Sequence, residues 1–171
     1  DEAAYAFDRA ASIDGSLARA WSGKAAALMK SGDVDGAAGA FGKAASLAPG
    51  DFDTNLGLAG ALYGAGRYSD AVDAYDAAIK LSPVSPAAWS GRGASLLASD
   101  KYAPALEAFE RALSFDPGDC AAHNAKGAAL LGLERYDEAL AAFGEATALN
   151  PENAAAWCNK AAALSSLHRY D

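Results

Sequence analysis

Few side chains in this sequence are spaced for chemistry. The 171 residues include two histidines and two cysteines, and of these only Cys120 and His123 lie near each other, three positions apart as on one helix face. A zinc site needs three or four such ligands, and no further ligand follows at a matching spacing. Acidic pairs such as Asp137 and Glu138 fall at expected helix starts, where they complement the helix dipole. The sequence therefore predicts no metal site, no cofactor and no enzyme.

Charge and composition argue against two classes of partner, nucleic acids and membranes. The chain has 14 Lys and Arg against 22 Asp and Glu, a formal net charge of -8, so it lacks the dominant basic field that nucleic-acid binding needs. Hydrophobic residues make up 52% of the chain, much of it alanine, without a membrane-length apolar run. Cys120 and Cys158 form no Cys-x-x-Cys pair and are expected to be free thiols. We therefore expect no nucleic acid, no membrane and a cytoplasmic location.

The elements that position these residues repeat every 34 positions. Placing Trp21, Asn55, Trp89, His123 and Trp157 in register also aligns a leucine seven positions later in every copy. Those leucines are Leu28, Leu62, Leu96, Leu130 and Leu164. A period of this length is typical of a solenoid, which presents an extended surface rather than a closed pocket, so binding is favoured over catalysis.

Each repeat predicts two helices of roughly 12 to 14 residues. In the first full copy, apolar residues at helical spacing run from Trp21 to Leu28 and again from Ala37 to Leu47, with a loop at residues 31–33 between them. Proline follows the second series in each copy and ends that helix, because it lacks an amide donor and restricts the preceding residue. Those prolines are Pro49, Pro83, Pro117 and Pro151.

Small residues recur where helices must touch. Three positions of the repeat hold only Ala or Gly, and an aromatic ring accompanies them on the second helix. Such positions allow helix axes to approach closely, while the rings fill the remaining space between neighbouring helices. The rings are Phe41, Tyr75, Phe109 and Phe143.

This pattern resembles the tetratricopeptide repeat (TPR). The residues that carry the resemblance are Trp21, Ala25, Leu28, Gly32, Ala37, Phe41, Ala44 and Pro49, and the next three blocks follow them with few departures. The resemblance implies an all-α, right-handed superhelical solenoid of antiparallel helix pairs. The single solenoid would consist of a half repeat at 1–17, full repeats at 18–51, 52–85, 86–119 and 120–153, and a half repeat at 154–171. We expect the chain to be part of a larger TPR protein.

Some positions depart from the family pattern. Asn55 and His123 replace an aromatic residue, which should leave their helices less tightly packed. Asp100, Glu134 and His168 stand where Gly32 and Gly66 fit a left-handed turn, and that turn would cost a residue with a side chain about 1–2 kcal/mol. Pro104 falls in the first turn of a second helix, where its missing amide has no partner.

The resemblance implies that the first helices line a concave groove. Mapping the family's groove places onto this chain gives a floor of small, mostly uncharged residues with an apolar row beside it, which suits an extended peptide or an amphipathic helix. The row is Met29, Tyr63, Leu97 and Leu131, and Asn124 and Asn159 are candidates to hydrogen-bond a ligand main chain. The alternative is that the leucines and methionine complete internal packing and that the asparagines are solvated. Some family members bind an acidic chaperone terminus through cationic groove residues, which are missing here.

A row of cations occupies a place where the family more often has leucine. It comprises Lys24, Arg92, Lys126 and Lys160, interrupted by Leu58. Long stems there pack against apolar surface while their charged ends reach water or helix carbonyls. The functional alternative is a set of anion contacts for an acidic ligand.

The sequence therefore predicts a protein-interaction scaffold that binds a peptide or amphipathic helix in its groove. The alternative is a structural spacer, or a solenoid that associates head to tail. In that case the half repeat ending at residues 169–171 would be completed by the second helix at residues 2–7 of another copy.

Overall fold

The computed structural model describes residues 2–167, and all regular secondary structure in that range is α-helical. The chain divides into two compact units, one reaching Pro83 and the other starting at Val84. The first unit contains α1 (Glu2–Ile13), α2 (Ala18–Ser31), α3 (Val34–Leu47), α4 (Phe52–Gly64) and α5 (Tyr68–Leu81). The second contains α6 (Pro86–Leu97), α7 (Tyr102–Phe115), α8 (Cys120–Gly132), α9 (Tyr136–Leu149) and α10 (Ala154–Ser166).

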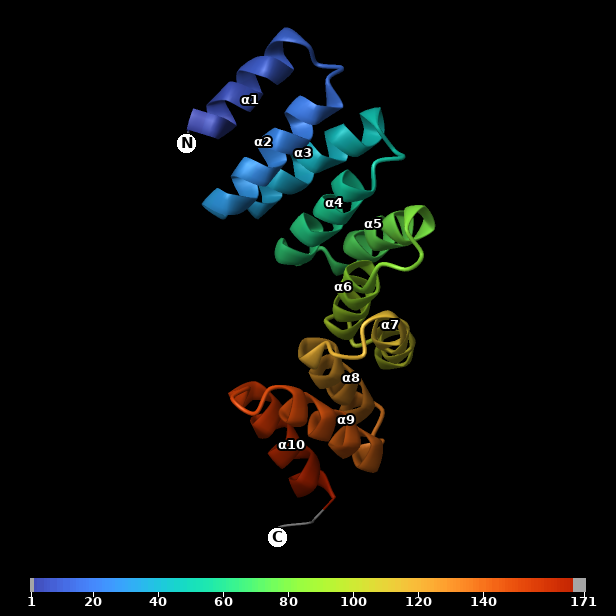
Figure 1. Cartoon of the computed structure of the whole chain (residues 1–171). Helices are drawn as coiled ribbons and strands as arrows, with labels where there is room; N and C mark the ends of the chain where they lie inside the picture. Colours follow the sequence, from blue (N-terminus) through green and yellow to red (C-terminus); the bar gives the residue numbers. More distant parts are fainter. Residues whose placement is uncertain (1, 168–171) are drawn as a thin grey trace. The chain divides into compact units, whose positions relative to one another are not determined.

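Within each unit, consecutive helices pack side by side (Figure 1). The first helices of successive repeats also touch, so α2 contacts α4 in the first unit, and α8 contacts both α6 and α10 in the second. Short connections force neighbouring helices to run antiparallel. These helix pairs confirm the all-α helical repeat that the period predicts.

Each second helix ends where the proline requires. The helices α3, α5, α7 and α9 finish two residues before Pro49, Pro83, Pro117 and Pro151. Pro104 lies at the third position of α7, within the first turn, and the helix continues without a break. Both findings agree with the predictions from proline's missing donor.

Each turn from first to second helix closes on a left-handed residue. In all four such turns of the described chain, an amide donates to the carbonyl five residues earlier, as Arg135 does to Leu130 at 2.9 Å. This bond belongs to the Schellman motif, which needs a positive φ at the helix end. Gly32 and Gly66 have φ of 83° and 74°, and Asp100 and Glu134 have 57° and 59°. Asp100 and Glu134 thus adopt the left-handed conformation that the sequence marked as costly for a residue with a side chain, while His168 lies outside the described residues.

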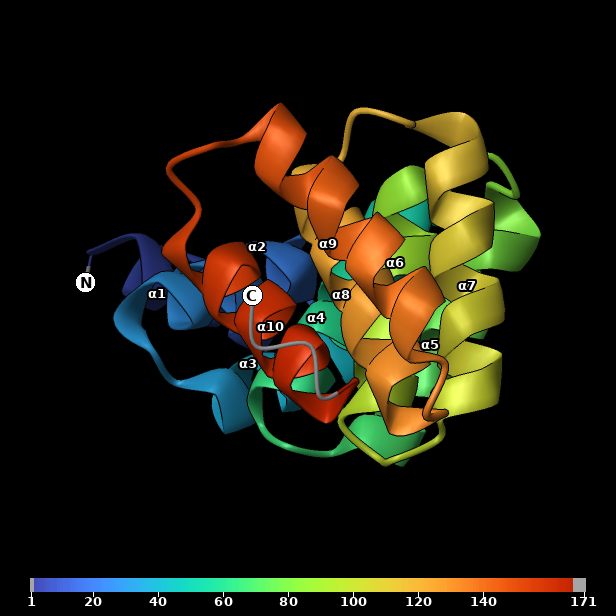
Figure 2. The same ribbon diagram turned by 90° about the horizontal axis from the view of Figure 1, so that it is seen from below.

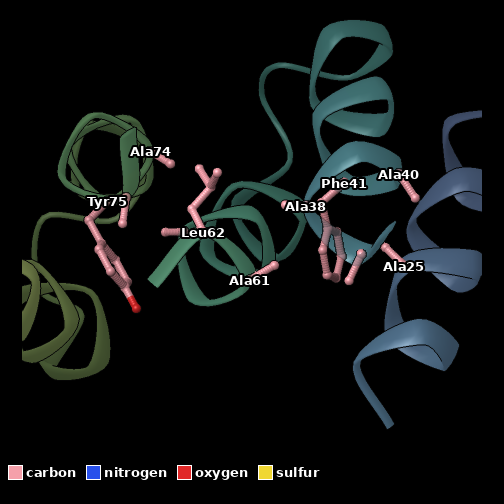
Figure 3. Packing of buried hydrophobic residues seen from close by; sticks show 11 residues of the cluster. Ala25, Ala38, Ala40, Phe41, Ala61, Leu62, Ala74 and Tyr75 are labelled. Carbon is pink, nitrogen blue, oxygen red and sulfur yellow. The ribbon is translucent and has the colours of Figure 1, made fainter. Parts of the chain in front are cut away.

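The aromatic rings of the second helices lie against small residues, as predicted. Phe41 in α3 is buried in a cluster that contains alanines of α2, α3 and α4, among them Ala25 and Ala38 (Figure 3). Its ring lies so close to Gly57 of α4 that a Cβ there would fall 2.6 Å from the ring. The ring of Phe109 turns the other way, toward Gly93 of α6 in its own repeat, where a Cβ would fall 2.8 Å away. Both of these rings thus occupy the side on which the neighbouring helix offers glycine.

The two rings of the second unit follow the same rule. Phe143 packs on Gly127 in the same repeat and is fully buried. At the place of Gly57 on the next first helix, this unit has Ala125 and Asn159, which leave less room for a ring. Ring direction is therefore set by which of two helix positions lacks a side chain.

Asn55, one of the two departures from the aromatic pattern, is buried rather than loosely packed. It is only 6% exposed, and its Nδ2 donates to the carbonyls of Pro49 (3.1 Å) and Asp51 (2.8 Å). Trp21 and Trp157 also donate from Nε1 to a carbonyl six residues earlier, at 3.1 and 2.9 Å. Asn55 therefore keeps the polar contact of the indole, so a buried asparagine is satisfied at an aromatic position.

Replacing Glu134 by glycine should stabilise the protein. The Glu134→Gly variant removes a left-handed residue with a side chain, so the free energy of unfolding should rise by about 1 kcal/mol in urea titrations followed by circular dichroism. The matched control is Gly66→Ala, which should lose about the same amount at the equivalent turn. Equal or lower stability of Glu134→Gly would contradict a strained turn.

Candidate peptide-binding groove

The structure places the predicted groove residues on first helices of both units. Met29 on α2 and Tyr63 on α4 belong to the first unit and are 37% and 40% exposed. The second unit holds Leu97 on α6, Asn124 and Leu131 on α8, and Asn159 on α10. Because α8 contacts both α6 and α10, the second unit brings four of the six predicted residues onto three adjoining helices.

The two asparagines bind each other. Asn159 Nδ2 donates to Asn124 Oδ1 at 3.0 Å, which joins α10 to α8. Both side chains are half-buried. An amide has two donor hydrogens and one acceptor oxygen, so the pair leaves the Nδ2 of Asn124 and the Oδ1 of Asn159 for other partners. This mutual bond was missed by sequence reasoning, which treated the two asparagines as separate ligand contacts.

Asn159 fits because the neighbouring aromatic ring points elsewhere. Its place in the repeat is Gly23 and Gly57 in the first unit, where a side chain would collide with the ring of Phe7 or Phe41. In the second unit Phe143 turns toward Gly127, so a side chain on α10 has room to reach α8. The signal in the sequence is therefore which side of the ring has glycine. Around Phe143 the glycine lies 16 residues before the ring, at Gly127, and the position 16 residues after it carries the side chain of Asn159.

The apolar members differ in accessibility. Leu97 and Leu131 are half-buried on neighbouring helices, so each offers only part of its surface. In the first unit, the ring of Tyr63 packs against Tyr68 with centroids 5.6 Å apart and planes tilted by 54°. Tyr63 is thus held by an aromatic contact within its own repeat, at a geometry favourable for ring pairs.

The cations of the predicted row already have partners. Lys24 on α2 forms an ion pair with Asp8 on α1, and Lys126 on α8 forms one with Glu110 on α7, with Nζ and Oε1 3.0 Å apart. Lys160 lies over the ring of Trp157 at 5.0 Å, and Arg92 is not free. Partly exposed pairs of this kind contribute about 0.2–1 kcal/mol each.

The carboxylates of these pairs explain the interruption of the row. Asp8 and Glu110 lie 16 positions before their lysines, on the preceding second helix. The residue 16 positions before Leu58 is Gly42, which has no charge to pair. The Leu58 side chain lies 4.0 Å from the place that a Cβ on Gly42 would occupy. A cation therefore stands where the preceding helix supplies a carboxylate, except Lys160, which follows Gly144 and uses the indole.

The thiols and histidine of the sequence make separate contacts. Cys120 Sγ donates to the Ala146 carbonyl at 3.3 Å and accepts from Asn153 Nδ2 at 3.4 Å, while His123 Nε2 lies 3.0 Å from the Pro117 carbonyl. Both cysteines are free. Within residues 2–167, no three His, Cys, Asp or Glu side chains are grouped for a metal ion. No helix in the same range is both long and apolar enough to cross a bilayer.

Comparison with known proteins identifies the repeat. Residues 56–119 and 120–153, together more than half of the chain, match models of the tetratricopeptide repeat. No curated protein sequence matches the chain.

Solved structures share the fold at low sequence identity. The MamA protein from Desulfovibrio magneticus RS-1 is 24% identical over 90% of this chain and 86% of its own, with a TM-score of 0.84. YrrB, described as a TPR protein with an unusual peptide-binding site, is 22% identical over 99% and 87%, with a TM-score of 0.80. The first TPR of Spaghetti (RPAP3), bound to the HSP90 peptide SRMEEVD, is 20% identical over 68% and 93%, with a TM-score of 0.67.

The asparagine pair predicts an energetic coupling between α8 and α10. In a double-mutant cycle, Asn124→Ala and Asn159→Ala should be less than additive by about 0.5–1.5 kcal/mol, because removal of either partner breaks the one hydrogen bond. Urea unfolding of the two single variants and the double variant measures this coupling. Asn124→Ala combined with Asn55→Ala, a residue of the other unit, is the additive control. Additivity in both cycles would refute the contact.

Proposed function

Because the chain belongs to the tetratricopeptide-repeat family, we propose that it is a protein-interaction scaffold whose second unit binds an extended peptide. The binding surface is formed by α6, α8 and α10, with Leu97 and Leu131 as apolar contacts and Asn124 and Asn159 as polar ones. Two solved structures with the same fold support this role, since YrrB is described with a peptide-binding site and RPAP3 with a bound peptide.

The asparagine pair is the observation that carries the proposal. It offers one amide donor on α8 and one carbonyl acceptor on α10, held in fixed positions by the bond between them. An extended peptide presents main-chain donors and acceptors in alternation, whereas a helix has already satisfied its own. The pair therefore favours an extended peptide over an amphipathic helix.

Charge selects the kind of peptide. Lys126 is paired with Glu110, and the groove floor is made of small uncharged residues, so little cationic charge is available for an acidic ligand. A strongly acidic peptide such as the SRMEEVD bound to RPAP3 would also meet the net charge of -8. We therefore expect the ligand to be neutral or basic, with apolar side chains spaced to meet the two leucines. Lys24 and Lys126 would be available only to a ligand that displaces Asp8 and Glu110.

Charged substitutions in the apolar row should abolish binding. A peptide would first be selected on the wild-type chain from a display library and its affinity measured by calorimetry. Leu131→Glu should then weaken it by about 30-fold or more, because a carboxylate would be buried against apolar ligand surface. Leu97→Glu should act in the same direction. Circular dichroism should show unchanged helicity.

The control is Leu149→Glu. Leu149 lies at the end of α9, outside the groove, and is 46% exposed, so the charge enters water there. Equal affinities of Leu131→Glu and wild type for the selected peptide would exclude this groove as the binding surface.

The second candidate function is self-association. On α1, Tyr5 and Ile13 are 69% and 80% exposed, and on α10 Trp157 is 47% exposed, so both helices offer apolar surface to another copy. The predicted junction also involves residues 169–171, which lie outside the described residues. A head-to-tail contact of this kind would build an open filament.

Sedimentation velocity over a wide concentration range separates the two functions. Self-association predicts that the mean mass rises with concentration and that Ile13→Glu suppresses the rise, because the charge would be buried in the junction. A constant monomer mass would exclude it.

We place the protein in a reducing compartment, the cytoplasm. The support is that Cys120 and Cys158 are both free and that Cys158 is exposed, a state that reducing conditions maintain.

A further inference from the structure

A hollow of about 240 Å³ lies between the two helices of the last full repeat, α8 and α9. Its lining includes neither Asn124 nor Leu131 of the groove. The lining residues are His123, Lys126 and Leu130 from α8, and Glu138, Ala141, Ala142 and Glu145 from α9. The two helices lie side by side in both views (Figure 1 and Figure 2). This volume is below the roughly 300–1,000 Å³ of pockets for drug-sized ligands, so it suits a single side chain.

The hollow lies beside His123, which stands at a position where three of the other four copies have tryptophan. Trp21, the equivalent residue of the first full repeat, packs against a cluster that contains buried alanines of α3, the second helix of its own repeat. Trp157 has no second helix after it within the described chain and is 47% exposed. The indole of Trp21 is thus partly buried against this cluster, and the smaller imidazole of His123 fills less of the equivalent space.

Lysine positions support the same assignment. Lys24 lies over the ring of Trp21 at 5.5 Å, and Lys160 lies over Trp157 at 5.0 Å, in each case three residues after the tryptophan. Lys126 is three residues after His123 and lines the hollow. An aromatic ring entering from outside would thus find a cation placed as in the two tryptophan repeats.

The remaining lining selects for an indole. Leu130, Ala141 and Ala142 offer apolar surface to the ring. Glu138 accepts two hydrogen bonds from Arg135 at 2.7 and 2.6 Å, and this guanidinium lowers the pKa of the Glu138 carboxyl below its ordinary value. Glu145 is exposed and forms no ion pair among the described residues, so its carboxylate is available to accept from an indole N–H.

Other occupants fit less well. A lysine or arginine side chain would meet Lys126 as well as Glu145, and its charged end would leave the apolar surface of the lining uncovered. A carboxylate would be repelled by Glu145, which has no cationic partner among the described residues. A phenyl ring would use the apolar surface but leave the Glu145 carboxylate without a donor.

We propose that the hollow between α8 and α9 binds a tryptophan side chain of a partner protein. It would be a second contact, separate from the groove and independent of whether a peptide binds there. The partner's indole would take the place of the ring that Trp21, Trp89 and Trp157 supply in the other repeats.

The test uses two probes on the complete chain: indole, and the tripeptide acetyl-Gly-Trp-Gly-amide. Both should give saturable shifts in ¹⁵N NMR spectra at His123, Ala141 and Ala142, with dissociation constants in about the millimolar range that ligands of this size reach. The same tripeptide with leucine in place of tryptophan is the control and should bind at least about 10-fold more weakly. N-methylindole should also be weaker, because it cannot donate to Glu145.

Two variants close the hollow from opposite sides. His123→Trp fills it from α8 and Ala141→Phe fills it from α9, and either should abolish the shifts caused by both probes. Their NMR spectra report folding, so a variant that unfolds is replaced by the other.

Three results would overturn the proposal. They are the absence of shifts at the lining residues in the wild-type chain, shifts that persist in a folded plugged variant, and binding of free indole without binding of the tripeptide. The last would show a small-molecule pocket rather than a protein contact.

Discussion

The seating of one aromatic ring per repeat against a helix face without side chains is the constraint on which this structure depends. Phe41 and Phe109 each fit where a neighbouring helix has glycine, because a Cβ there would lie within about 3 Å of the ring at Gly57 and Gly93. Full burial of such a ring stabilises a protein by several kcal/mol, an amount that alanine contacts alone do not supply. Close helix spacing, alanine-rich faces and unbroken stacking within each unit follow from this fit.

The aromatic ring of a second helix can pack against the first helix of its own repeat or against that of the next repeat. Which of the two it contacts affects the residues that the groove can carry. In the first unit Phe41 faces the following first helix and takes up the place beside Gly57, so that helix must stay bare there. In the second unit Phe143 faces its own first helix at Gly127, which allows α10 to carry Asn159 and to bond with Asn124. The polar character of the proposed peptide site is thus a consequence of core packing, even though neither asparagine is in the core.

Much of the fold was predictable because it depends on features that are local in sequence. The period, the helix ends before Pro49 and its equivalents, and the left-handed turn at Asp100 and Glu134 follow from backbone rules that act within a few residues. Ring direction, by contrast, depends on two alternative positions 16 residues away on either side. Sequence reasoning recognised that the position before the ring holds only Ala or Gly, and it did not consider the position after the ring.

The candidate site was less predictable for a similar reason. Lys24 and Lys126 were interpreted without the carboxylates of the preceding helices, and these determine where a cation stands. The asparagines were predicted as groove residues, but their mutual bond depends on the space beside Phe143. In each case the missing information was a contact between side chains on adjacent helices. The periodic pattern compares equivalent positions and does not show such contacts.

The replacements of tryptophan separate two functions of that residue. A tryptophan at this position supplies a hydrogen bond to a carbonyl six residues earlier and also fills the volume between two helices. Asn55 keeps the hydrogen bond to Pro49, and His123 Nε2 lies at the same distance range from Pro117. The polar contact is local and is satisfied by any side chain with a nitrogen in the right place, whereas the volume is specific to the indole. His123 keeps a polar contact with Pro117, and its repeat is folded around the hollow that lies beside the imidazole.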